Sequence, residues 1–189
     1  MADCGDDFVE CHERFERIEH AVALGLAQLR RGPRPAVAAA LGDTVVEAAR
    51  VCETGLLLAA EDDLWSWLCP ATALWDRLGA LTSSVQAAGL AVPEPEAPQA
   101  EVAGLLRRLH SARDELSDRL AAFDRYPRDR ATAAGLDVAI ADLQAAGDRM
   151  VAIALETDGT TRLDAAVAVL TAVAATAGRA HRRRAQGTR

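Results

Sequence analysis

The four cysteines are the residues of this chain best suited to bind a metal or undergo redox chemistry. All four lie in the first half, at positions 4, 11, 52 and 69. If the chain folds back on itself at Pro33 as two antiparallel helices, position 11 lies level with about position 55. Cys52 is then within one helical turn of Cys11. Thiols gathered in this way could bind a soft metal, sense oxidants or hold a small ligand.

Further polar side chains belong to the same end of the predicted helices. The candidate metal-binding or thiol-redox residues are Cys11, His12, Cys52, Glu61, Asp62 and Asp63. Structural roles account for them better, because buried cysteine is an ordinary core residue and the three acids are suited to capping the next helix. The sequence also lacks the closely spaced cysteine pairs of zinc sites. We therefore expect no cofactor and keep a helical bundle that binds a small ligand or a metal, or that carries out thiol-redox chemistry, as the alternative.

Sequence motifs for catalysis are missing from the chain. It contains no GxxxxGK[ST] or GxGxxG phosphate loop, no HExxH, no CxxC, no Glu-x-x-His pair and no GxSxG elbow. The single histidines His20 and His110, on helix flanks, are more typical of surface residues than of catalysts. We do not expect an enzyme, although one without a recognisable motif stays open as a third alternative.

The elements that must position these residues are all helical. Alanine, the strongest helix former, occurs 42 times, and only 4% of residues are aromatic. Apolar residues recur every three or four positions, which predicts six helices. Their expected ranges are about 6–30, 35–58 or beyond, 70 to at least 85, 100–125, 130–156 and 161–180. The third is expected to begin with Pro70 in its first turn, and residues 157–160 are expected to form a turn and N-cap.

An internal similarity suggests how these helices are organised. LAQLRRGPR at 26–34 resembles LAAFDRYPR at 120–128, and a shift of 94 residues places the apolar stripe of the first helix on that of the fourth. Such similarity is typical of a duplicated unit, which we favour over the alternative of chance similarity between Ala- and Leu-rich helices. We expect an all-α pseudo-twofold bundle of two tandem three-helix units. Their predicted ranges are 1–92 and 100–180, with a Pro-rich linker at 93–99 and a disordered Arg-rich tail at 181–189.

Charge and hydropathy limit the expected partners. The net charge of the chain is −7. Residues 1–94 alone have a net charge of −8, whereas residues 179–189 contain five Arg and no acid. An acidic body repels nucleic acid and anionic membranes, so only the Arg tail is suited to bind RNA, an acidic partner or the acidic half of another copy of this chain. The apolar run 165–175 is too short to span a bilayer, and the acidic N-terminus does not resemble a secretory signal. We therefore predict a cytoplasmic protein that does not bind membranes.

These observations favour a non-catalytic interaction, scaffold or regulatory protein that binds another protein. Helices built on Ala leave little room for a large pocket. Trp65 and Trp67, two residues apart, cannot both face the same side of a helix, so we predict that they mark an interface. A homodimer is compatible with the sequence.

Overall fold

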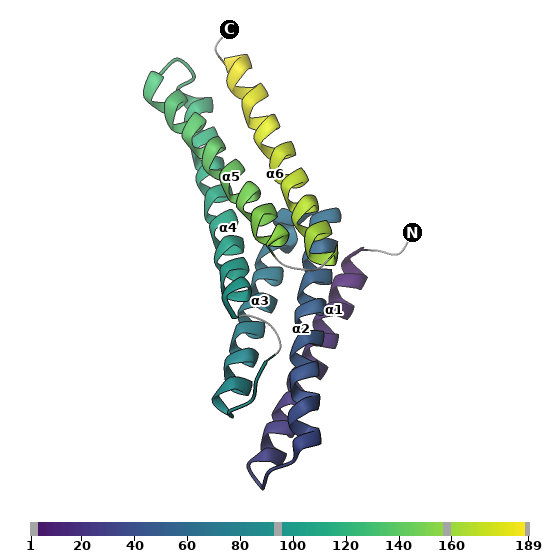
Figure 1. Cartoon of the computed structure of the whole chain (residues 1–189). Helices are drawn as coiled ribbons and strands as arrows, with labels where there is room; N and C mark the ends of the chain where they lie inside the picture. The colour runs from purple at the N-terminus through teal and green to yellow at the C-terminus, as the bar shows by residue number, and fades with distance from the viewer. Residues whose placement is uncertain (1–3, 93–95, 157–159, 188–189) are drawn as a thin grey trace. The chain divides into compact units, whose positions relative to one another are not determined.

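The computed structural model describes residues 4–92, 96–156 and 160–187, and these form six α-helices (Figure 1). The chain is all-α, as predicted, and its helices pack as a bundle. The helices are α1 (Cys4–Leu29), α2 (Pro35–Glu61), α3 (Leu64–Ala87), α4 (Glu96–Arg125), α5 (Arg130–Leu155) and α6 (Thr160–Gly187). The predicted turn at 157–159 and the linker residues 93–95 lie outside the described residues.

The start of α3 corrects the sequence prediction. The helix begins at Leu64, six residues before Pro70, which lies inside it. Asp63 provides the start, because its carboxylate accepts hydrogen bonds from the amide of Trp65 at 3.2 Å and from the hydroxyl of Ser66 at 2.6 Å. This N-cap satisfies amide groups that the first helical turn leaves without partners. The helix ends at Ala87, and Gly89 follows with a φ of 78°, which glycine adopts without steric cost.

Both ends of the second half also differ from expectation. Helix α4 begins at Glu96 rather than near 100. Pro98 is compatible with this start, because it falls in the first turn, where a missing N–H removes no helical hydrogen bond. Helix α6 continues through residues 181–187 of the predicted disordered tail. Arg183 binds Asp124 on α4 at 2.8 Å, and Arg184 binds Asp137 on α5 at 2.7 Å. These ion pairs connect the last turns of α6 to α4 and α5, and the burial of Ala177 and Ala180 continues the packed face of the helix in the same region.

The chain divides into two compact units, Met1–Ala103 and Gly104–Arg189, with the division inside α4. In the first unit α2 packs along both α1 and α3, and α1 also meets α3. Most of the core side chains are apolar, and the largest of those that are fully buried include Phe15, Leu64, Leu68, Leu74, Trp75 and Leu78.

In the second unit α5 packs along α6. Gly147 lets the two helices approach closely, since a Cβ at this position would lie 3.1 Å from Val173 and 3.2 Å from Leu170. Helix α4 joins this pair through Arg119, which lies against Gly135 of α5, and through Phe123, which lies against Gly187 of α6.

Helix α6 is long and apolar enough to cross a bilayer. It contains an 18-residue window of mean hydropathy 1.4, a third of which is buried within the protein. Length and composition alone give this result, and the core helix of a soluble protein meets the same criterion. It is the single helix of this kind in the described part of the chain.

Candidate functional site

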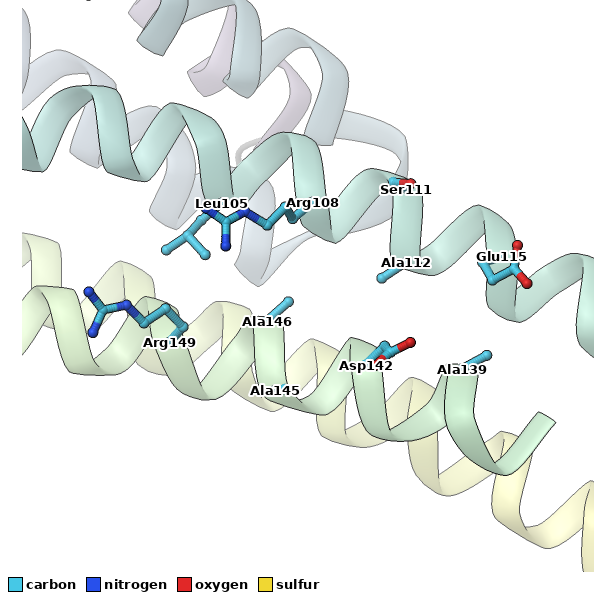
Figure 2. Close-up of a pocket in the computed structure, with 10 residues that line it drawn as sticks. All are labelled: Leu105, Arg108, Ser111, Ala112, Glu115, Ala139, Asp142, Ala145, Ala146 and Arg149. Atoms are coloured by element: carbon cyan, nitrogen blue, oxygen red, sulfur yellow. The ribbon is translucent and has the colours of Figure 1, made fainter. Parts of the chain in front are cut away.

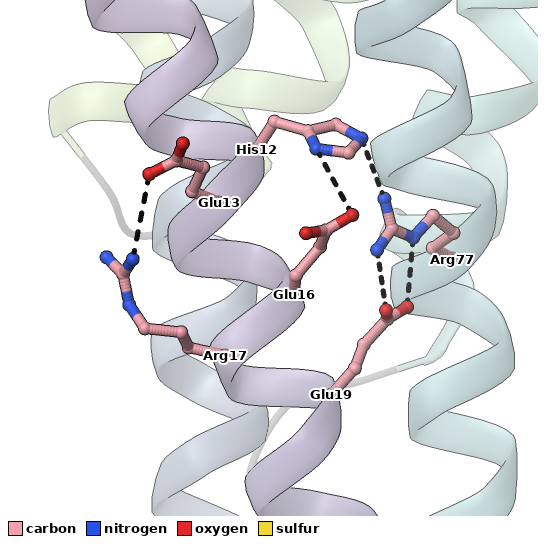
Figure 3. Close-up of polar contacts among 6 residues, drawn as sticks. All are labelled: His12, Glu13, Glu16, Arg17, Glu19 and Arg77. Atoms are coloured by element: carbon pink, nitrogen blue, oxygen red, sulfur yellow. Dashed lines mark hydrogen bonds and ion pairs between the residues drawn. The ribbon is translucent and has the colours of Figure 1, made fainter.

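A cluster of charged side chains joins α1 to α3 in the first unit (Figure 3). The guanidinium of Arg77 donates two hydrogen bonds to Glu19, from Nε to Oε1 at 3.0 Å and from Nη2 to Oε2 at 2.5 Å. Its Nη1 lies 3.0 Å from Nε2 of His12, and Nδ1 of the same ring lies 3.6 Å from Glu16. The hydrogen bond to Glu19 raises the pKa of Arg77. The polar groups of the cluster therefore bind one another.

The sequence of α1 explains why this cluster forms. His12, Phe15 and Glu19 are spaced by three and four residues, so they lie on one face of the helix. The Arg77 guanidinium lies 5.1 Å from the centre of the Phe15 ring, a cation–π contact. The cluster can hold α1 against α3, which is a structural role.

The cysteines are placed where thiol chemistry is suppressed. Cys11 and Cys52 are buried, and Sγ of Cys52 donates a hydrogen bond to the carbonyl of Leu74 at 3.5 Å. Burial raises the pKa of both thiols, most strongly that of Cys52. Reactive cysteines are instead exposed and of low pKa. Cys69 is exposed on α3, and the side chain of Cys4 lies outside the described residues.

The other candidate metal ligands do not come together with the thiols. Glu61, Asp62 and Asp63 are exposed at the turn between α2 and α3, where Asp63 caps α3 as considered from the sequence. His12 is engaged with Arg77. Among the described residues no group of three His, Cys, Asp or Glu side chains is arranged to hold a metal ion.

The two tryptophans at the start of α3 are both half-buried. The Trp67 ring lies tilted against that of Phe8 of α1, with centroids 4.8 Å apart, and its Nε1 donates a hydrogen bond to Asp62 at 3.1 Å. Trp67 thus fastens the start of α3 to α1. The prediction that Trp65 and Trp67 mark an interface is not tested by these contacts.

The second unit contains a groove between α4 and α5 that the sequence analysis did not identify (Figure 2). Its volume is about 440 Å³. Helix α4 lines it with Leu105, Arg108, Ser111, Ala112 and Glu115, and α5 lines it with Ala139, Asp142, Ala145, Ala146 and Arg149. The groove therefore has small side chains in its middle and charged side chains toward its ends.

The charges of this groove are separated by sign. Arg108 and Arg149 lie toward one end, and Glu115 and Asp142 lie toward the other (Figure 2). All four are exposed. Such an arrangement suits a partner that carries the opposite polarity along its length.

Two of these side chains have neighbours in the second unit. Glu115 accepts a hydrogen bond from Arg119 at 2.6 Å, and Arg149 lies 3.6 Å from Glu156. The side chains of both pairs are about half exposed, namely Glu115, Arg119, Arg149 and Glu156. Exposed ion pairs of this kind contribute about 0–1 kcal/mol, so a partner can replace them at little cost.

A second hollow, of about 380 Å³, lies in the first unit. Its lining comes from α1 and from the end of α3, and consists of Leu26, Leu29, Arg30, Ser84, Ala87 and Ala88. With one charged residue it offers fewer polar contacts than the α4–α5 groove. The latter is therefore the stronger candidate site.

Comparisons of this chain with models of protein families, with curated proteins and with solved structures found no match.

Proposed function

We propose that this protein is a non-catalytic interaction, scaffold or regulatory protein, and that the α4–α5 groove is its binding surface. The observation that carries the proposal is the separation of charge along the groove, with Arg108 and Arg149 at one end and Glu115 and Asp142 at the other. Between them Ala112, Ala145 and Ala146 let another helix approach closely, because small side chains shorten the distance between packed helix axes.

No observation favours the alternatives in the same way. A thiol-redox or metal-binding bundle would use Cys11 and Cys52, whose burial raises their pKa. An enzyme would use polar side chains aimed at a substrate, whereas Arg77 and Glu19 are aimed at each other. The interface at Trp65 and Trp67, the cytoplasmic location and the absence of membrane binding stay as predictions from the sequence.

We also infer that the chain arose by duplication of a three-helix unit. Adding 94 to the bounds of α1 gives 98–123, and α4 spans Glu96–Arg125. The same shift applied to α2 gives 129–155, against Arg130–Leu155 for α5. For α3 it gives 158–181, against Thr160–Gly187 for α6.

Burial supports the same shift. Positions that it pairs on α1 and α4 are buried in both halves, namely Phe8 with Val102, Cys11 with Leu105, Phe15 with Leu109 and Val22 with Leu116. On the third helix of each half, Ala71 pairs with Ala165 and Trp75 with Val169, again all buried. Shared burial is what two copies of one packing plan would retain.

A bulky substitution tests the proposed binding surface. Ala145 is exposed in the groove, so Ala145→Trp should fill it without disturbing the core. The size of the complex formed by the tagged chain is measured in extracts of its source cells. We expect the wild-type complex to exceed the 20.0 kDa chain mass and the variant to fall toward it.

The matched control is Ala27→Trp, at an exposed position of α1 in the other unit. It should leave the complex unchanged. If Ala145→Trp and Ala27→Trp both leave the complex at its wild-type size, the groove is not the binding surface.

A further inference from the structure

We propose that the α4–α5 groove binds the same groove of a second copy of this chain, across a twofold axis through its alanine-lined middle. This inference rests on the proposed function and names the partner. A twofold axis at right angles to the length of the groove exchanges its two ends, so Arg108 and Arg149 of one copy face Glu115 and Asp142 of the other. A groove with opposite charges at its two ends is therefore complementary to itself.

The spacing of the charges fits a helix-on-helix contact. Arg108 and Glu115 are seven residues apart on α4, and Asp142 and Arg149 are seven apart on α5. Seven residues are two helical turns, or about 10.5 Å along the axis. Both helices thus present a positive and a negative side chain on one face, separated by the same distance. Two antiparallel copies can satisfy both ends at once.

An exposed apolar seam on α5 continues the surface. Ala134, Val138, Ala141 and Ala145 are exposed and spaced by four, three and four residues, which places them along one side of the helix. The side chain of Val138 is 59% exposed. Ala145 belongs to both the seam and the groove, so a partner lying in the groove covers the seam at Ala145. This coverage would remove apolar surface from water.

In the first unit the corresponding face of α2 is buried. The shift of 94 pairs Asp142, Ala145, Ala146 and Arg149 of α5 with Ala48, Val51, Cys52 and Gly55 of α2, all of which are buried. Gly55 lies against Leu74 of α3 and Phe8 of α1, at 3.5 and 3.6 Å from the position of an added Cβ. This face of α2 is covered by other helices of its own unit. The corresponding face of α5 is exposed at Asp142, Ala145 and Arg149 and carries one negative and one positive side chain.

The area of the face is adequate for a stable dimer. The 26 residues of α5 span about 39 Å, and a face two helices wide and of comparable length offers on the order of 700 Å². A standard protein interface buries about 800 Å² on each partner. The two grooves together would form a four-helix contact whose centre is alanine and whose flanks are ion pairs.

Charge exchange between two variant chains provides the decisive test. Arg108→Glu with Arg149→Glu makes both ends of the groove acidic, and Glu115→Arg with Asp142→Arg makes both ends basic. Molar mass is measured by sedimentation equilibrium on the full chain from about 1 to about 100 μM, a range that detects dissociation constants in the micromolar range. We expect wild type to reach twice the 20.0 kDa chain mass and each variant alone to weaken association at least about tenfold.

Mixing the two variants should restore a one-to-one dimer, because acidic ends then face basic ends. The control is Arg113→Glu with Arg125→Glu, which makes the same change in net charge at exposed positions outside the groove. This control should associate as wild type does. Helical content measured on every variant shows that the chains are folded, and the mixing experiment itself shows that both grooves are intact.

Several results would overturn the inference. One is a wild-type chain that stays monomeric throughout this range; another is a mixture that fails to associate. If the wild type is monomeric but Ala145→Trp still reduces the complex in cell extracts, the groove binds a different protein, so the self-association fails and the proposed function stands. If neither experiment shows an effect, both proposals fail.

Discussion

Arg77 of α3 and Glu19 of α1 form a bidentate ion pair that joins two helices far apart in the sequence. The guanidinium contacts both carboxylate oxygens, at 3.0 and 2.5 Å, and its side chain is 29% exposed. Paired hydrogen bonds between an arginine and a carboxylate fix geometry as well as contributing energy. Through these hydrogen bonds and its contact with Phe15, Arg77 connects α3 to α1.

Removing this arginine should destabilise the first unit. We expect Arg77→Ala to lower the free energy of unfolding by about 1–2 kcal/mol, since the hydrogen bonds are charge-assisted but partly screened by solvent. Arg113→Ala, at an exposed position beside Asp114, should change it by less than about 0.5 kcal/mol. Urea unfolding followed by circular dichroism measures both. Equal effects would show that the Arg77 cluster contributes nothing specific.

The buried thiols predict a loss of stability at alkaline pH. Burial raises the pKa of Cys52 well above its ordinary value of 9.0 and also raises that of Cys11. A folded-state pKa above the unfolded one means that the folded chain holds more protons above pH 9, so stability is full below that pH and falls as pH rises further. Urea unfolding at pH 7 and pH 10 measures this change.

The control for this prediction is Cys52→Ala, which removes the more strongly shifted thiol. It should make the difference between the two pH values smaller, although the variant itself is less stable. An undiminished difference would assign the alkaline effect to other groups. Cys69, which is exposed, should react with a thiol reagent in the folded chain, whereas Cys52 should react only after unfolding.

Two helical glycines should respond to substitution in opposite directions. A side chain at Gly147 would press on Val173 and Leu170, so we expect Gly147→Leu to destabilise the second unit by about 1–3 kcal/mol. Gly79 has nothing within 4 Å of an added Cβ, so Gly79→Ala should stabilise α3 by about 0.5–1 kcal/mol. Thermal unfolding of the two variants compares them. A stabilising Gly147→Leu would contradict the close approach of α5 and α6.

Neighbouring residues of α6 distinguish a core helix from a membrane-spanning one. Val173 is fully buried and Ala174 is exposed. If α6 packs on α5 in water, Val173→Asp should cost more than about 4 kcal/mol, because it places an unpaired charge in the core, and Ala174→Asp should cost little. Soluble yield and urea unfolding measure both. Equal loss of the soluble folded chain from the two substitutions would favour a bilayer as the surroundings of α6.

Much of the fold follows from sequence periodicity. The apolar stripes predicted six helices, and the observed bounds of α1, α2 and α5 agree within a few residues. The predicted start of α3 at Pro70 was wrong, because the N-cap at Asp63 determines where this helix begins and Pro70 lies inside it. The end of α6 was missed because an Arg-rich sequence is typical of a solvated tail, and its ion pairs with Asp124 and Asp137 appear only when the helices are packed.

The groove could not be predicted in the same way. Arg108, Asp142 and Arg149 each have the sequence signature of a solvated helix face, and only packing shows that α4 and α5 present them around one hollow. The similarity between the two halves at a shift of 94 residues contained one signal that could have identified the groove. It pairs Asp142 with Ala48 and Arg149 with Gly55, so the α5 face is charged where the α2 face is small and uncharged. Conversely, the sequence placed the candidate ligands at the same end of the helices as Cys11 and Cys52. In the structure His12 binds Arg77 and Asp63 caps α3.

Photo-crosslinking from within the groove tests the central claim most directly. A photoreactive amino acid replaces Ala145 in the full chain, or Ala27 as the control, and the chain is irradiated in its source cells. We predict discrete adducts from position 145 and none of the same size from position 27. Adducts from both positions in equal yield, or from position 27 alone, would contradict the claim that the α4–α5 groove is where this protein binds its partner.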